Sequence, residues 1–204
     1  MGIKLNGSTS GYVELDAPAT AGNNTLRMPT SNGSAGQSMT TDGAGNLSFG
    51  SSIVSGTAQN STSGTAIDFT GIPSWAKRIT VMFSGVSTSG TADLLVQIGS
   101  GSVQNSGYAS TTNQISTASG SGGTNSTSGF VLRSASAASL VSAQMVLTLV
   151  SGNTWVASHN GKSSTALTIQ GGGDVSLSGT LDRVRITTTG TDTFDAGSIN
   201  ILYE

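Results

Sequence analysis

Nearly half of the 204 residues in this chain are serine, threonine or glycine, and this excess limits the chain to a fold with few or no helices. Glycine loses more backbone entropy than other residues in a helix, while serine and threonine side chains compete for the backbone hydrogen bonds that a helix needs. No window is rich in alanine, leucine, glutamate and lysine with a 3.6-residue period. The sequence therefore predicts an all-β protein.

The supply of apolar residues is small, yet the chain does not have the charge of a disordered one. Only 9% of residues are charged and the formal net charge is −2, whereas disordered chains combine low hydrophobicity with high net charge. Small side chains let sheets pack closely, and association between copies adds buried surface that one chain lacks. We therefore expect a folded protein that associates with copies of itself.

Composition argues against several classes of protein. The chain has no cysteine, so it has neither disulfides nor thiolate metal sites. No segment approaches about 18 consecutive apolar residues, so we expect no membrane insertion. An isoelectric point near 5.2, without any basic cluster, offers nothing to neutralise phosphates, so we expect no nucleic-acid partner.

Strand signals divide the chain into three parts. Residues 1–50 carry short alternations, with strands expected at 12–15, 25–28, 37–40 and 46–49. Residues 51–65 are small and polar, as in a linker. Residues 66–204 carry longer signals, with strands expected at 66–69, 78–83, 92–98, 129–133, 140–150, 154–159, 181–188 and 197–203. Such spacing without intervening helices predicts an antiparallel, jelly-roll-like β-sandwich after an N-terminal arm rich in β-hairpins.

Three further details of this pattern can be interpreted from the residue types. Residues 140–150 are apolar enough for a short buried helix, although their β-branched content favours a strand. Residues 116–128 are rich in glycine, serine and threonine and are expected to form a loop, and residues 99–128 as a whole supply loops on the sandwich. Asn160-Gly161 is expected to be the turn after the strand at 154–159.

The stretch Asp42-Gly-Ala-Gly-Asn46 contains the residue types of a calcium or phosphate loop. A calcium loop needs several carboxylates, and the next acid after Asp42 is Asp68. A phosphate-binding loop of the Walker type needs a lysine, and none follows. Asp-Gly and Gly-Asn between two alternating segments are instead typical of a tight hairpin. We therefore interpret the stretch as a turn.

No catalytic, cofactor-binding or metal-binding residue is assigned by the sequence. His159 shares an expected strand face with Trp155, but no acid has a recognised spacing to it and no Gly-x-Ser-x-Gly elbow is present. We interpret His159 as a rim residue near a turn. Asp174, Asp192 and Asp195 could form a weak calcium site at loop ends, although turn caps are the simpler interpretation.

Five side chains are candidates for interface or receptor contacts. Exposed Trp75, Tyr108 or Trp155 could stack on sugars, although the two tryptophans equally suit a core or an interface. Arg183 and Arg185 lie on one face of an expected strand and could clamp a carboxylate of a neighbouring subunit, or could simply be solvated.

Two longer segments carry a resemblance to a known family, FTGIPSWAKRITVMFSGVSTSG at 69–90 and TLDRVRITTTGTDTFDAGSINILYE at 180–204. They resemble virion proteins of tailed bacteriophages, including cyanophages, that are described as tail-fibre or fibre-like proteins. IKLNGSTSG at 3–11 and GQSMTTDGAGNLSF at 36–49 resemble N-terminal modules of such proteins.

The resemblance implies a non-enzymatic homotrimer on the virion surface, assembled in the host cytoplasm, whose N-terminal part joins other virion proteins of the capsid or tail. It implies no cofactor, and a host-surface glycan stays open as a partner. The leading hypothesis is a fibre-like host-adsorption protein. A trimeric capsid cement protein is the alternative because the chain has no extended shaft. A tailspike-type glycan hydrolase is disfavoured because acids are sparse.

Overall fold

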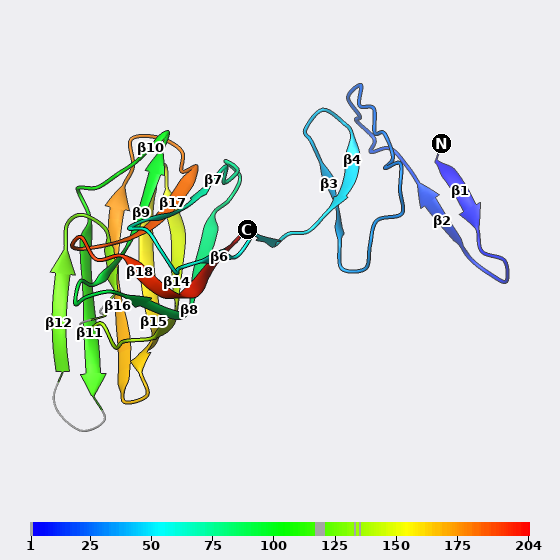
Figure 1. Ribbon diagram of the computed structural model, residues 1–204. Helices are drawn as coiled ribbons and strands as arrows, with labels where there is room; N and C mark the ends of the chain where they lie inside the picture. The colour runs from blue at the N-terminus through cyan, green and yellow to red at the C-terminus, as the bar shows by residue number, and fades with distance from the viewer. Residues whose placement is uncertain (1, 117–120, 133, 135) are drawn as a thin grey trace. The chain divides into compact units, whose positions relative to one another are not determined.

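This computed structural model describes residues 2–116, 121–132, 134 and 136–204, and every regular element in that part of the chain is a β-strand. The all-β prediction is confirmed. Figure 1 shows the elements in chain order, and the chain divides into two compact units, residues 1–52 and 53–204. None of the described residues forms a helix that could cross a membrane.

The first unit consists of two separate hairpins. Strand β1 (Ile3–Asn6) pairs with β2 (Tyr12–Leu15), and β3 (Ser38–Thr41) pairs with β4 (Leu47–Gly50). Every described residue up to Ser52 is exposed or half-buried, so this unit has no hydrophobic core of its own.

The strand expected at 25–28 does not form. Arg27 makes only an isolated bridge with Asn46. The physical reason is Pro29, which lacks the backbone N–H that a ladder needs and restricts the residue before it.

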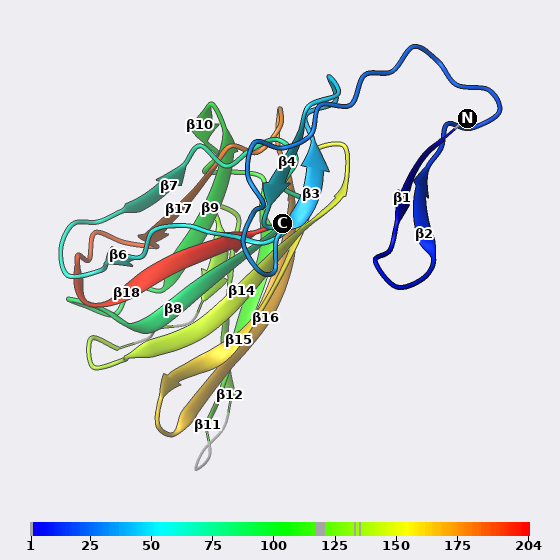
Figure 2. The same ribbon diagram turned by 90° about the vertical axis from the view of Figure 1, so that its right-hand side faces the viewer.

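The second unit is a sandwich of two antiparallel sheets. The large sheet has the order β12-β11-β16-β15-β14-β8-β18-β5, with β6 also on β18 (Figure 2). Its strands are β5 (Val54–Ser55), β6 (Gln59–Asn60), β8 (Arg78–Thr88), β11 (Ala109–Ser116), β12 (Ser121–Ser126), β14 (Val141–Ser151), β15 (Thr154–Ser164), β16 (Leu167–Ser176) and β18 (Phe194–Tyr203). The small sheet has the order β10-β9-β17-β7, with β13 also on β9. Its strands are β7 (Ile67–Thr70), β9 (Leu94–Ser100), β10 (Ser102–Val103), β13 (Phe130–Leu132) and β17 (Arg183–Thr188).

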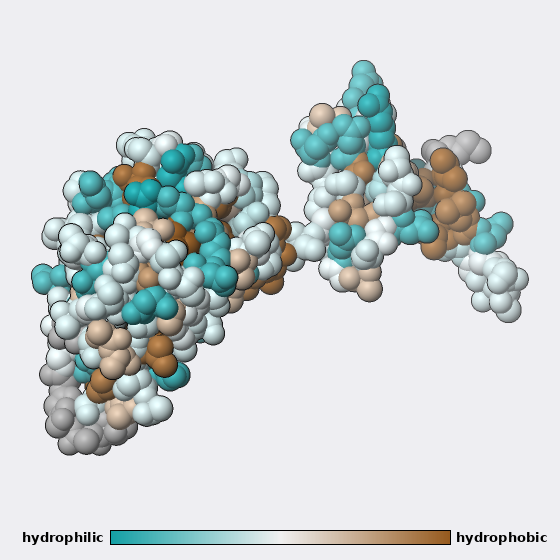
Figure 3. Space-filling view, in the orientation of Figure 1, coloured by the Kyte–Doolittle hydropathy of each residue, from teal (hydrophilic) through white to brown (hydrophobic). Residues whose placement is uncertain are grey.

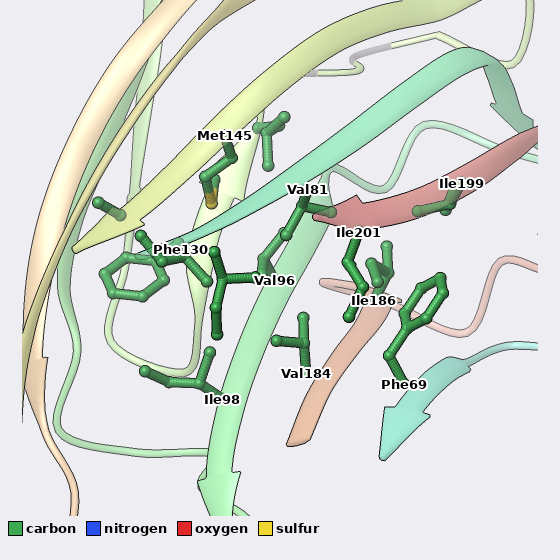
Figure 4. Close-up of a cluster of buried hydrophobic side chains, with 14 of the residues drawn as sticks. Phe69, Val81, Val96, Ile98, Phe130, Met145, Val184, Ile186, Ile199 and Ile201 are labelled. Carbon is green, nitrogen blue, oxygen red and sulfur yellow. The ribbon is translucent and has the colours of Figure 1, made fainter. Parts of the chain in front are cut away.

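The chain passes back and forth between the two sheets, as in a jelly roll. It runs from β7 in the small sheet to β8 in the large one and back to β9 and β10. It then passes to β11 and β12 in the large sheet, to β13 in the small one, to β14, β15 and β16 in the large one, and ends with β17 and β18 in the small and large sheets. The core lies between the layers, where Val96 and Ile186 of the small sheet face Val81, Met145 and Ile201 of the large one (Figure 4). Residues 141–150 belong to β14 and Leu140 directly precedes it, so the helical alternative is wrong.

The segment expected to be a linker, 51–65, contributes to the sandwich from Ile53 onward. β5 and β6 both pair with β18, and the buried Ser61 hydroxyl donates to the Ala196 carbonyl over 2.8 Å. The segment is held by backbone groups and one small hydroxyl instead of by apolar side chains. It therefore lacks the apolar alternation from which a strand is predicted.

Two further expectations differ from the structure. Asn160-Gly161 lies within β15 and is not a turn. An added Cβ on Gly161 would meet the Cβ of Ala143 at 2.4 Å, so glycine is needed here because β14 and β15 lie close together. The expected loop at 116–128 contains strand β12, while its residues 117–120 lie outside the described residues. The side chains from Gly122 to Ser126 in β12 are exposed or half-buried, so this strand has no apolar alternation to predict it.

Candidate functional site

The Asp42–Asn46 stretch is a hairpin turn between β3 and β4, as predicted. The Asp42 carboxylate accepts hydrogen bonds from the backbone N–H groups of Ala44 and Asn46, at 2.8 and 3.1 Å, and from the Asn46 side-chain amide at 2.5 Å. The Asn46 amide, followed by the Ala44 N–H, lowers the pKa of Asp42. Because these neighbours already occupy the carboxylate oxygens, the turn closes on itself.

His159 is buried and does not lie on the rim, contrary to expectation. It is only 5% exposed because β15 continues past it, and its Nε2 lies 2.9 Å from the Thr112 hydroxyl. Its Nδ1 has no hydrogen-bond partner within the described part of the chain. Burial lowers the pKa of His159 to about 4, so the ring is neutral near pH 7. Among the described residues, neither nitrogen of the ring has the acid partner that a catalytic histidine needs.

Tyr108 and Trp155 are core residues, so their rings are not available to a receptor. They are 3% and 2% exposed. The Tyr108 hydroxyl accepts a hydrogen bond from the Ile98 N–H at 2.8 Å and donates one to the Gln104 carbonyl at 3.1 Å. Its ring packs edge-on against Phe130, with centroids 5.0 Å apart. Burial raises the pKa of Tyr108 to about 12.

Trp75 is the one of the three aromatic candidates that reaches solvent. Half of its surface is exposed (50%), and its ring centroid lies 5.7 Å from that of Tyr203 at a tilt of 49°. This pair forms an aromatic surface beside the last strand. It could contact another protein or a sugar, as the sequence predicts.

The two candidate arginines are held by acids of the same chain. Arg185 donates to both carboxylate oxygens of Asp68, each bond 2.7 Å long, and Arg183 donates to Asp182 at 2.8 and 3.1 Å. The bond from Arg185 is the main cause of the lowered pKa of Asp68. A carboxylate from a neighbouring subunit would have to displace these bidentate pairs.

The acids considered for a calcium site do not assemble into one. The Asp192 carboxylate accepts a hydrogen bond from the Ala92 N–H at 2.8 Å, which is the behaviour of a turn cap. Among the residues that the structure describes, no three histidine, cysteine, aspartate or glutamate side chains are grouped as metal ligands.

The β1–β2 hairpin carries an apolar face that no described residue of its own unit buries. Ile3 pairs with Leu15 and Leu5 pairs with Val13, so all four side chains point to one side of the ribbon. They are 67%, 64%, 58% and 64% exposed, respectively. In Figure 3 apolar residues gather on the surface of this unit. Lys4 and Glu14 form an ion pair at 3.5 Å on the opposite side of the hairpin.

The outward face of the large sheet carries a row of five carboxamides and one methionine, which we call the amide row. The strand registers align Asn200, Met82, Gln144, Asn160, Gln170 and Asn113 side by side across six neighbouring strands. The next row contains Thr80, Val146, Ser158, Gly172, Thr111 and Asn125. Side chains on opposite strands lie about 5 Å apart, so neighbouring amides can contact one ligand.

Two adjoining depressions lie beside the amide row, over the glycines of β16. One has a volume of about 780 Å³, and its exposed lining side chains are Thr111, Asn113, Asn125, Asn160 and Gln170. The other, of about 610 Å³, shares Thr111 and Asn125 and extends over Gly172 and Gly173. We call the two together the glycine trough. No charged residue is among the described residues that line it.

Sequence reasoning missed the amide row and the glycine trough. The three consecutive glycines at 171–173 were the available signal, since glycine in a strand often marks a close approach of another backbone or of a ligand. In this fold an added Cβ on Gly171 would meet the Thr111 carbonyl at 2.2 Å, so close strand approach explains at least that glycine.

Comparisons with protein-family models, curated proteins and solved structures gave no match for this chain. The site is therefore interpreted from its own residues.

Proposed function

We propose that this chain is a non-enzymatic structural protein of a tailed-phage virion, a fibre-like protein that takes part in adsorption to the host. The apolar face of the β1–β2 hairpin is the observation that carries this proposal. A two-stranded hairpin is at best marginally stable alone, so side chains such as Leu5 and Val13 need other chains to cover them. Copies of the same chain, arranged as a homotrimer, and a protein of the particle are the coverings proposed.

The polar groups of the sandwich support a passive role. The sole histidine is buried against Thr112, and the acids Asp68 and Asp182 are bound by arginines. A glycan hydrolase needs a pair of carboxylates free to act on a bond between sugars. The exposed side chains that line the larger depression of the glycine trough instead carry hydroxyls and amides, which bind without performing chemistry.

Decoration of the capsid is the second candidate. Its support is the form of the first unit, in which residues 2–52 make two separate hairpins of four-residue strands instead of a repeated shaft. A short arm of this kind suits a clamp between neighbouring subunits of a head as well as an attachment to a tail.

Imaging of particles that carry a labelled copy of this protein tests the proposal. A small set of copies at the tail, together with loss of adsorption but intact heads after deletion, supports the fibre-like role. Many copies spread over the head, with heads that break more easily after deletion, support decoration. Absence of the protein from purified particles contradicts both.

A further inference from the structure

We propose that the glycine trough and its amide row bind an uncharged glycan chain. The inference rests on the proposed adsorption role, which provides a host surface as the source of the glycan. Its physical basis is the chemistry of the lining side chains, the form of the trough and the absence of charge among the described residues that line it.

The amides that border the glycine trough are free to bind a ligand, whereas Asn200, at the far end of the amide row, donates to the Ser55 hydroxyl and accepts from the Ile201 N–H. Gln144 and Gln170 make no side-chain hydrogen bond to another described residue, and both are exposed. The other glutamines of the sandwich behave differently: each donates to a neighbouring group, and these are Gln59, Gln97, Gln104 and Gln114. The fold therefore uses its other glutamines internally and leaves the two on this face unengaged.

A free carboxamide matches a sugar hydroxyl in hydrogen bonding. It offers two donors and one acceptor oxygen with two lone pairs, and a hydroxyl both donates and accepts. Asn113, Asn125, Asn160 and Gln170 surround the larger depression, so several hydroxyls of one ligand can be bound at once.

The glycines of β16 give the trough its form. Ser158 of β15 and Thr111 of β11 lie on either side of Gly172, which has no side chain to fill the space between them. Because the two depressions share Thr111 and Asn125, the trough is elongated, which suits a chain of sugar units better than one small molecule.

The uncharged lining and the free amides argue against three other ligands: an acidic polysaccharide, a nucleic acid and a second copy of this sheet. An acidic polysaccharide or a nucleic acid would find no cation in the described lining of the trough. A second copy of this sheet would bury the free amides against one another, and each unmatched amide would then lack the water it hydrogen-bonds when exposed. A neutral, hydroxylated chain satisfies the amides without either penalty.

Affinity electrophoresis of the full chain in gels that contain dextran, mannan or galactan tests the inference, with acidic alginate as the comparison polymer. We expect at least one neutral polysaccharide to retard the wild-type protein and alginate to leave it unretarded. The double variant Asn113→Ala/Asn160→Ala should weaken that retardation by about tenfold or more, because each lost hydrogen bond lowers affinity. Both positions are exposed, so the fold should persist.

Asn60→Ala is the matched control, because Asn60 is an exposed asparagine in β6, at the opposite edge of the large sheet from β12. It should leave the retardation unchanged. The inference is overturned if no neutral polysaccharide retards the wild type, if Asn60→Ala is as damaging as the double variant, or if the double variant changes the oligomeric mass. If the protein is found on particles but binds no neutral polysaccharide, the proposed function stands and only this inference is contradicted. If it binds a neutral polysaccharide but is absent from particles, the proposed function is contradicted and the binding site stands.

Discussion

Ile3 of β1 lies directly opposite Leu15 of β2, and the two side chains remain 67% and 64% exposed. Leu5 and Val13 repeat the arrangement one pair further along the hairpin. The hairpin therefore has two exposed apolar pairs on one side and an ion pair on the other. The proposed assembly of this protein depends on that face.

The double variant Leu5→Ser/Val13→Ser should weaken self-association without unfolding the sandwich. Burying a leucine or valine side chain contributes about 1.5–3 kcal/mol, so the dissociation constant of the oligomer should rise by more than about tenfold. Sedimentation equilibrium measures this change. Asn6→Ser, on the opposite side of the hairpin, is the control and should leave association unchanged. Equal association by the double variant and the wild type would exclude this face as the interface.

Tyr108→Phe should lower the free energy of unfolding by about 1–2 kcal/mol, since it leaves the buried Ile98 N–H without its acceptor. Urea unfolding measures the loss, with Tyr203→Phe as a half-buried control that should have little effect. The wild type should also lose stability as pH rises from 10 to about 12, because the unfolded chain releases the Tyr108 proton first. That part of the pH dependence should be absent in Tyr108→Phe. A variant with wild-type stability would show that the hydrogen bond contributes nothing.

His159 should make the sandwich less stable in mild acid. Its pKa is lowered from 6.5 to about 4 by burial, so the unfolded chain binds its proton more readily in that interval. The stabilisation is complete above pH 6.5 and is lost as pH falls toward 4, with a total on the order of 3 kcal/mol. Urea unfolding at several pH values measures the slope. His159→Gln removes the titrating group and should flatten it, whereas an unchanged slope would assign it to other groups.

Asp42→Ala should loosen the β3–β4 hairpin and leave the sandwich intact. The carboxylate closes the turn through Ala44 and Asn46, so their amide hydrogens should exchange faster in the variant. In the wild type the pKa of Asp42 is lowered, so the same loosening should develop as pH falls below 3.8. Addition of calcium should change neither exchange rate. Calcium-dependent protection at this turn would show that the loop binds the metal.

Strands with apolar alternation were predictable from the sequence. β8, β14, β17 and β18 each place apolar side chains on the core face at alternate positions over part of their length, as Ile199 and Ile201 do in β18. Such alternation reports one-sided burial directly. The all-β fold follows from it and from the residues that disfavour helices.

The strands β11, β12 and β16 could not be predicted in the same way. Their inward positions include Ser110, Thr112, Gly171 and Gly173, which are small or polar, so the two faces of these strands hardly differ in hydrophobicity. For the same reason β15 seemed to end at Asn160-Gly161, although it continues to Ser164.

The candidate site was beyond sequence reasoning because it depends on register. Asn113, Gln144, Asn160 and Gln170 come from four strands, and three separate pairings must be known before they form one row. Burial was equally hidden for Tyr108, which the sequence offered as a surface aromatic and which the fold uses as a core residue.

The molar mass of the full chain in solution, measured by light scattering at micromolar concentration, tests most directly whether this is a self-assembling scaffold. A homotrimer has three times the 20.2 kDa mass of one chain, and we expect this mass, with the apolar side of the β1–β2 hairpin covered in the assembly. A stable monomer at 20.2 kDa would contradict it.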